Sequence, residues 1–191
     1  MISDLILSLF AFYLYFQHRT QNQKWSLFFL FLGLSALVGG VCHGFTMIGE
    51  YFRFLSWSFL SIALVFAQLA AYQNNKNRII ETVFVLKSIL LLFLSILNTN
   101  FEFMVFDTLI SMLGFIVIGN LFFLKSLSKY ISYGILISLS SAFFVIYKIS
   151  IHPLYLTFND IGHYISIISI IVMSRGVRKE TLNQLIKIEK S

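Results

Sequence analysis

Seven long apolar runs, each separated from the next by a short polar break, make up almost the whole chain. The hydrocarbon core of a bilayer is about 30 Å thick and is crossed by an α-helix of roughly 20 apolar residues. Backbone polar groups cannot stay unpaired in lipid, so we expect each run to form a helix. The pattern predicts an all-α polytopic membrane protein, a single bundle of seven transmembrane helices. The predicted spans are 3–17, 25–48, 54–73, 79–97, 103–124, 130–149 and 155–174.

The composition agrees with this fold class. Of the 191 residues, 58% are hydrophobic and 12% are charged, whereas roughly 25% of residues are charged in soluble domains. The polar breaks are too short to divide the chain, so residues 1–174 are expected to form one transmembrane domain. The basic segment 175–191 has the pattern of a short amphipathic helix or of a plain cytoplasmic tail. The single cysteine, Cys42, excludes an intramolecular disulfide and a cysteine-based zinc cluster.

Lysine and arginine are concentrated on one side of the predicted bundle. That side holds 11 of the 14 basic residues, while the opposite side holds only Arg53 and Lys148. Because basic loops stay in the cytoplasm, we expect the N-terminus outside and the C-terminus inside, in a bacterial cytoplasmic (inner) membrane. The net charge of +6 then reflects topology and attraction to anionic membrane lipids, with no sign of nucleic-acid binding. The 11 residues are Arg19, Lys24, Lys76, Arg78, Lys125, Lys129, Arg175, Arg178, Lys179, Lys187 and Lys190.

Three ionisable residues lie inside predicted spans: His43 near the end of the second, and Asp160 and His163 near the start of the seventh. A charge at membrane depth costs at least about 2.5–3.5 kcal/mol, so such residues usually have a partner or a function. Asp160 and His163 are three positions apart and therefore share one face of a helix. At 1.5 Å per residue, the three lie ~8 to ~12 Å below the outer surface. They are expected in one layer of the membrane.

Two imidazoles and one carboxylate form a donor set typical of catalytic zinc, which keeps one position open for water. Zinc held by His43, Asp160 and His163 would activate that water and polarise a carbonyl group. Asp107 in the fifth span and Glu50 at the outer mouth of the second are candidate general bases in the same half of the membrane. The alternative is structural: each histidine hydrogen-bonds a serine or a carbonyl group of a neighbouring helix.

A further basic residue, Lys87, lies in the body of the fourth span. The nearest acids are Glu81 on its own helix and Asp107 on the fifth. An uncompensated charge in lipid is expensive, so a buried Lys87–Asp107 pair is predicted.

The helix number, the orientation and two short motifs resemble the superfamily of alkaline ceramidases and progestin/adiponectin receptors. Its members carry a Ser and a His one turn apart on the second helix, an acid on the third and His-x-x-x-His on the seventh. Here GGVCHG places His43 after Gly39, at the serine position, and NDIGH places His163 after Asn159, at the first histidine position. The body of the third span carries no acid. The resemblance implies a seven-helix, zinc-dependent hydrolase of lipid amide or ester bonds, with Asp160 as substitute ligand.

Two functions of different class are compatible with these features. The first is an integral-membrane, zinc-dependent hydrolase acting on an amide or ester bond of a lipid-like substrate. The second is a non-enzymatic seven-helix protein, such as a small-molecule transporter, receptor or accessory subunit. In that protein the same polar cluster forms a structural or proton-linked network. Metal content and lipid hydrolysis distinguish the two.

Overall fold

The computed structural model describes residues 2–75, 77–124, 127–152 and 156–189, and for 46–48, 50, 123–124 and 183–189 it describes the backbone alone. Within these residues the chain forms seven helices and no strand. The fifth helix is continuous but changes from α-helical to π-helical hydrogen bonding at Leu109. The elements are α1 (Ile2–His18), α2 (Gln23–Gly44), α3 (Thr46–Ala71), α4 (Arg78–Leu97), α5 (Glu102–Thr108), η1 (Leu109–Ile118), η2 (Asn120–Leu124), α6 (Lys129–Ile146) and α7 (Phe158–Glu189).

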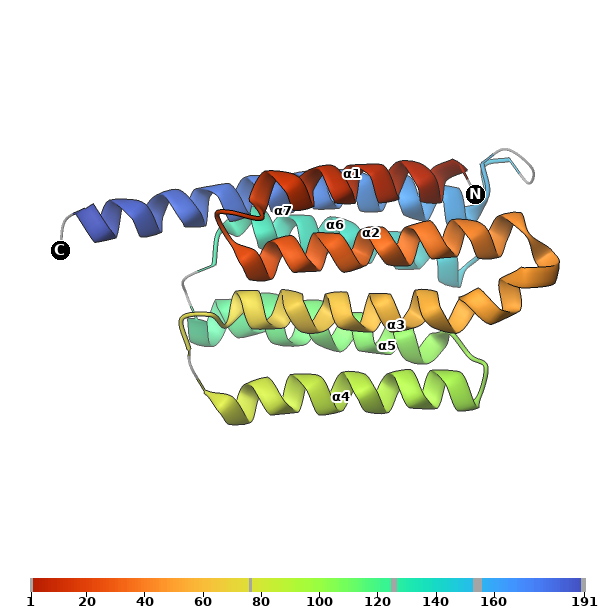
Figure 1. Ribbon diagram of the computed structural model, residues 1–191, viewed down its shortest axis with the longest axis horizontal. Helices are drawn as coiled ribbons and strands as arrows, with labels where there is room; N and C mark the ends of the chain where they lie inside the picture. The colour runs from red at the N-terminus through yellow and green to blue at the C-terminus, as the bar shows by residue number, and fades with distance from the viewer. Residues whose placement is uncertain (1, 76, 125–126, 153–155, 190–191) are drawn as a thin grey trace.

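The helices pack side by side in two layers (Figure 1). In that view α1, α2, α3 and α4 follow one another from top to bottom, and α7, α6 and α5 lie behind the first three. The start of α1, the α2–α3 bend, the α4–α5 turn and the start of α7 lie at one end. We call this the N-terminal end of the bundle. The C-terminal end of α7 extends beyond the opposite end.

Six of these helices are long and apolar enough to cross a membrane. They include α2, most of α3, α4, the fifth helix, α6 and the first 25 residues of α7. The remaining helix, α1, has 17 residues. The architecture is therefore all-helical, with the composition of an integral membrane protein.

The predicted spans coincide with the helices except at two places. The hydropathy pattern extends the second span to residue 48 and begins the third at residue 54, but α2 ends at Gly44 and α3 begins at Thr46, so the predicted break lies within α3. Phe45 between them has a non-helical backbone (φ −131°, ψ 87°), which ends α2, and its N–H donates to the Val41 carbonyl. Hydropathy does not register such a bend inside an apolar run. At the other end, α7 continues through the basic segment to Glu189, while the start of the seventh span, residue 155, lies outside the described residues.

Small residues bring α6 and α7 into close contact. A Cβ atom added at Gly134 would lie 2.8 Å from the Ser169 carbonyl oxygen, and one added at Gly176 would lie 2.8 Å from the Ile131 backbone nitrogen. The Ser169 hydroxyl donates to the Gly134 carbonyl at 2.8 Å. Close approach of this kind stabilises helix pairs in lipid through van der Waals contact and interhelical hydrogen bonds. It fixes the position of α7, which carries His163.

Candidate functional site

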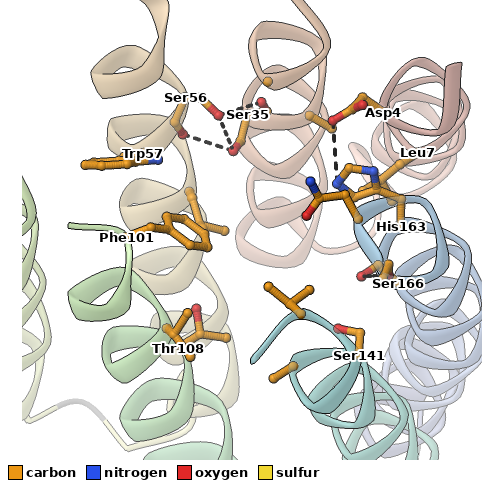
Figure 2. Close-up of a pocket in the computed structure, with 18 of the residues that line it drawn as sticks. Asp4, Leu7, Ser35, Ser56, Trp57, Phe101, Thr108, Ser141, His163 and Ser166 are labelled. Atoms are coloured by element: carbon orange, nitrogen blue, oxygen red, sulfur yellow. Dashed lines mark hydrogen bonds and ion pairs between the residues drawn. The ribbon is translucent and has the colours of Figure 1, made fainter. Parts of the chain in front are cut away.

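A cavity of about 790 Å³ lies in the N-terminal half of the bundle. Residues of α1, α2, α3, the fifth helix, α6 and α7 line it, and among the described residues α4 contributes none. Leucine side chains such as Leu32, Leu60 and Leu139 form much of the wall. Figure 2 shows two polar groups in it, one at the α1–α7 contact and one between α2 and α3. The cavity is therefore amphipathic.

His163 of α7 and Asp4 of α1 face each other at the edge of this cavity (Figure 2). The distance from His163 Nε2 to Asp4 Oδ1 is 3.5 Å. The histidine side chain is 24% exposed and the aspartate side chain only 3%. A hydrogen bond between nitrogen and oxygen is usually 2.7–3.2 Å. Asp4 can therefore stabilise a proton on Nε2 electrostatically without holding it in a short hydrogen bond.

Thr157 and Asp160 together cap the start of α7. Asp160 Oδ2 accepts hydrogen bonds from the Thr157 backbone N–H at 3.0 Å and from the Thr157 hydroxyl at 2.7 Å. The Asp160 backbone N–H donates in return to Thr157 Oγ1 at 3.4 Å. This reciprocal pattern is a capping box, which satisfies N–H groups that a helix start leaves unpaired. The other oxygen, Oδ1, accepts from the Ser3 hydroxyl at 2.6 Å.

The same Ser3 oxygen lies 3.1 Å from His163 Nδ1. A serine has one hydroxyl proton, and here Ser3 donates it to Asp160. Ser3 can then only accept from His163, so Nδ1 carries the ring proton. In a neutral imidazole the other nitrogen is a lone-pair acceptor, and that nitrogen, Nε2, faces Asp4. The arrangement makes Nε2 a proton acceptor whose protonated form is stabilised by a carboxylate.

The second polar group joins α2 to α3. The Ser35 hydroxyl donates to the Ser56 carbonyl at 2.9 Å, and the Ser56 hydroxyl donates to the Ser35 carbonyl at 2.9 Å. Next to them the rings of Trp57 and Phe101 pack with centroids 5.7 Å apart. Figure 2 shows this aromatic pair across the cavity from His163. One side of the cavity thus carries the acid and base side chains of Asp4 and His163, and the other carries the aromatic rings of Trp57 and Phe101.

The chain matches the model of a family of unknown function, DUF6962, over residues 1–182. It belongs to that family. The match includes α1, which supplies Asp4, and the part of α7 that supplies His163. No curated protein and no solved structure matches the chain.

In this DUF6962 member, the two motifs from the sequence meet in one cavity. His43, Asn159 and His163 all line it. His43 is exposed, and a positive charge on it acts electrostatically on His163. A Cβ atom added at Gly39, one turn before His43, would lie 3.5 Å from Asp4 Oδ1 and 3.5 Å from Ser56 Oγ. Position 39 thus borders both polar groups.

The predicted zinc ligands do not form a metal cluster in this arrangement. Both carboxylate oxygens of Asp160 accept hydrogen bonds from Ser3 and Thr157. Among the residues that the structure describes, no group of three His, Cys, Asp or Glu is arranged to hold a metal ion. The zinc that the resemblance implies therefore does not fit the side chains as placed, and zinc binding stays a prediction.

Of the two candidate bases, Asp107 has a side chain that the structure describes. Asp107 is fully buried and forms the predicted ion pair with Lys87, which is confirmed. Ser88 and Ser111 also donate to Asp107, each at 3.3 Å, and Asp107 is not among the cavity-lining residues. The side chain of Glu50 lies outside the described residues.

Sequence reasoning missed Ser3 and Asp4. Asp4 is an acid within the first apolar run and carries the same signal as Asp160 and His163: an ionisable residue at membrane depth. The sequence also contains the Thr157-x-x-Asp160 signature of a capping box. That signature would have assigned Asp160 to the helix start.

Proposed function

We propose that this protein is an integral-membrane hydrolase that cleaves an amide or ester bond of a lipid-like substrate. The observation that carries the proposal is the His163–Asp4 pair at the edge of an amphipathic cavity. General base catalysis needs a neutral imidazole within reach of the proton it removes, with a group that stabilises the imidazolium formed. His163 Nε2 and Asp4 provide these two elements.

In the proposed reaction, His163 Nε2 removes a proton from a water molecule as the water oxygen adds to the substrate carbonyl carbon. The carbonyl oxygen becomes an oxyanion, and the side-chain amide of Asn159, which lines the same cavity, is the candidate donor to it. The imidazolium then returns the proton to the leaving nitrogen or oxygen as the carbon–nitrogen or carbon–oxygen bond breaks. The products are a carboxylic acid and an amine or alcohol.

The lining of the cavity supports a lipid-like substrate. Leu7 and Leu139 offer apolar contact, while Asp4 and His163 define a polar pole. Ligand sites are typically apolar cavities with a few well-placed polar groups, and 790 Å³ is within their usual range of about 300–1,000 Å³. An amphiphile would place its chain along the leucines and its carbonyl group at His163.

The distribution of charge supports an orientation with this site in the outer half of the membrane. Arg19, Lys24, Arg78 and Lys129 lie at or next to helix ends opposite the N-terminal end of the bundle. Under the positive-inside rule, the end of the bundle that carries these basic residues is cytoplasmic. The N-terminus and the cavity then lie on the outer side. In this arrangement α1 crosses the membrane as the seventh spanning helix. Three further basic residues of the same predicted side, Lys76, Lys125 and Lys190, lie outside the described residues.

The test is lipid hydrolysis by purified protein in neutral detergent. A ceramide, a lysophospholipid and a diacyl phospholipid are offered separately, and released fatty acid is measured by mass spectrometry. We expect release from at least one of them, reduced by about 10²–10⁴-fold in His163→Gln because a general base is lost. His152→Gln is the matched control, since His152 is at the same end of the bundle but is not among the cavity-lining residues.

Chelator treatment and elemental analysis of the same samples test the metal separately. Release that survives the chelator supports general base catalysis by His163. Release abolished by the chelator, with bound zinc lost in His43→Ala and His163→Ala, would instead establish the zinc hydrolase. Failure to cleave any lipid would leave the receptor or transporter as the better account.

A further inference from the structure

The Asp4–His163 pair marks one level of the cavity, at which four helices meet. Asp4 of α1 lies 3.5 Å from His163 of α7. A Cβ atom added at Gly39 of α2 would lie 3.5 Å from Asp4 Oδ1 and 3.5 Å from Ser56 Oγ of α3. These four positions therefore lie at about the same height along the bundle. We call this height the reactive level.

The cavity continues only a short way from the reactive level toward the end of the bundle opposite the N-terminal end. Among the described residues, the last ones that line it in this direction are Leu7 of α1, Leu32 of α2, Leu60 of α3 and Ser166 of α7. By residue number they are three, seven, four and three positions beyond the reactive level on their helices. The helices run side by side (Figure 1). At a rise of 1.5 Å per residue, this inner part of the cavity is ~4.5 to ~10.5 Å deep.

Packed side chains close the cavity at its inner end. On each of the six lining helices, a buried residue three or four positions beyond the last lining residue belongs to one hydrophobic core. Leu32 and Leu139, which line the cavity, pack against this core. The six core residues are Ala11, Phe29, Leu64, Met112, Ile135 and Ile170. Protein interiors of this kind contain few voids larger than a water molecule, so the cavity has a closed apolar floor.

We propose that this floor limits the acyl chain of the substrate to one shorter than the chains of ordinary membrane lipids. The inference rests on the proposed function in that the carbonyl group at His163 is the one that carries this chain. A membrane-lipid chain spans half of the hydrocarbon core, or ~15 Å, which exceeds the depth of the cavity below the reactive level. The polar part of the substrate points the other way, where His43 and Asn159 line the cavity one turn from the reactive level. The substrate class is therefore an amide or ester of a short- or medium-chain acid.

Two substitutions change the depth of the cavity in opposite directions. Leu139→Ala removes a side chain from the floor and deepens the cavity. Ser166→Leu adds a larger side chain at the last lining position of α7 and shortens the cavity without removing a core side chain. Leu91→Ala is the matched control for the loss of a leucine, because Leu91 is half-buried on α4, which contributes no described residue to the lining.

The experiment measures binding to the full chain in neutral detergent, with glycerol monoethers that carry an octyl or a hexadecyl chain. The ether bond is not hydrolysed, and the shared headgroup leaves the chain as the only difference. Relative to partition into detergent without protein, we expect the octyl ether to bind tenfold or more tightly than the hexadecyl ether. Leu139→Ala should reduce this preference by about tenfold, as expected from the apolar area of the missing side chain. Ser166→Leu should weaken octyl binding by a similar factor, and Leu91→Ala should leave both affinities unchanged.

Equal affinity for the two ethers would overturn the inference. So would a preference that changes in neither Leu139→Ala nor Ser166→Leu, or that changes as much in Leu91→Ala. The two proposals fail separately because binding of an ether needs no hydrolysis. Selection of the octyl chain without cleavage of any lipid supports the floor and not the hydrolase. Cleavage of octanoyl and palmitoyl forms of one lipid at equal rates supports the hydrolase and contradicts the floor.

Discussion

At the scale of single residues, the role of His163 is set by side chains on another helix. Ser3 gives its proton to Asp160 and accepts from Nδ1, which leaves Nε2 facing Asp4. The carboxylate of Asp160 is therefore two contacts away from the accepting nitrogen. In the proposed mechanism Asp160 is a positioning residue that acts through Ser3, while Asp4 acts directly on the imidazole.

Asp4→Asn tests the direct role. An asparagine at this position lacks the charge that stabilises the imidazolium, and its amide is able to donate to Nε2 and occupy the lone pair. We expect kcat to fall by about 10²-fold or more, with KM little changed, in steady-state fatty-acid release. Glu102→Gln is the control, because Glu102 is exposed at the same end and does not line the cavity. Equal kcat in Asp4→Asn and the natural protein would remove Asp4 from the mechanism.

At the scale of helices, most of the architecture was predictable because a bilayer imposes a length and an apolar composition on each span. The fifth helix, predicted at 103–124, is found at 102–124. The bend at Phe45 was not predictable, since it interrupts the backbone without interrupting the apolar run. The sequence predicts one membrane layer for His43 and His163 from topology and helix rise, and in the structure both line the cavity. The contact of α1 with α7 was not predictable, because it joins residues 160 positions apart in the chain.

The α6–α7 contact gives a prediction for one glycine. In Gly134→Ala the new methyl group would lie 2.4 Å from Met173 Cγ and 2.8 Å from the Ser169 carbonyl oxygen, so the helices must separate. We expect a loss of about 1–3 kcal/mol of unfolding free energy, as for other overpacked interiors. The measurement is chemical denaturation in detergent. Gly114→Ala is the control, because an added Cβ there meets nothing within 4 Å; an equal loss in both variants would contradict the contact.

At the scale of the whole molecule, the bundle separates two kinds of polar group. The Lys87–Asp107 pair with Ser88 and Ser111 lies between α4 and the fifth helix, and none of the four residues is among those lining the cavity. The Asp4–His163 pair lies where α1 meets α7 and borders the cavity. The depth of a residue along its helix can be predicted from the sequence, but depth does not specify which face of a helix meets which neighbour. The sequence therefore could not predict which of the two polar groups borders the cavity. This is why the sequence offers Asp107 both as a candidate base and as the partner of Lys87, and the structure has the ion pair.

The most direct test of the central claim, that neutral His163 removes a proton in the cavity, is the pH dependence of kcat/KM for the cleaved lipid. Only the neutral imidazole accepts a proton, so the rate should rise with pH through an ionisation that belongs to His163. In His163→Gln the residual rate should lose that ionisation. A pH profile of kcat/KM that is unchanged in His163→Gln would contradict the account.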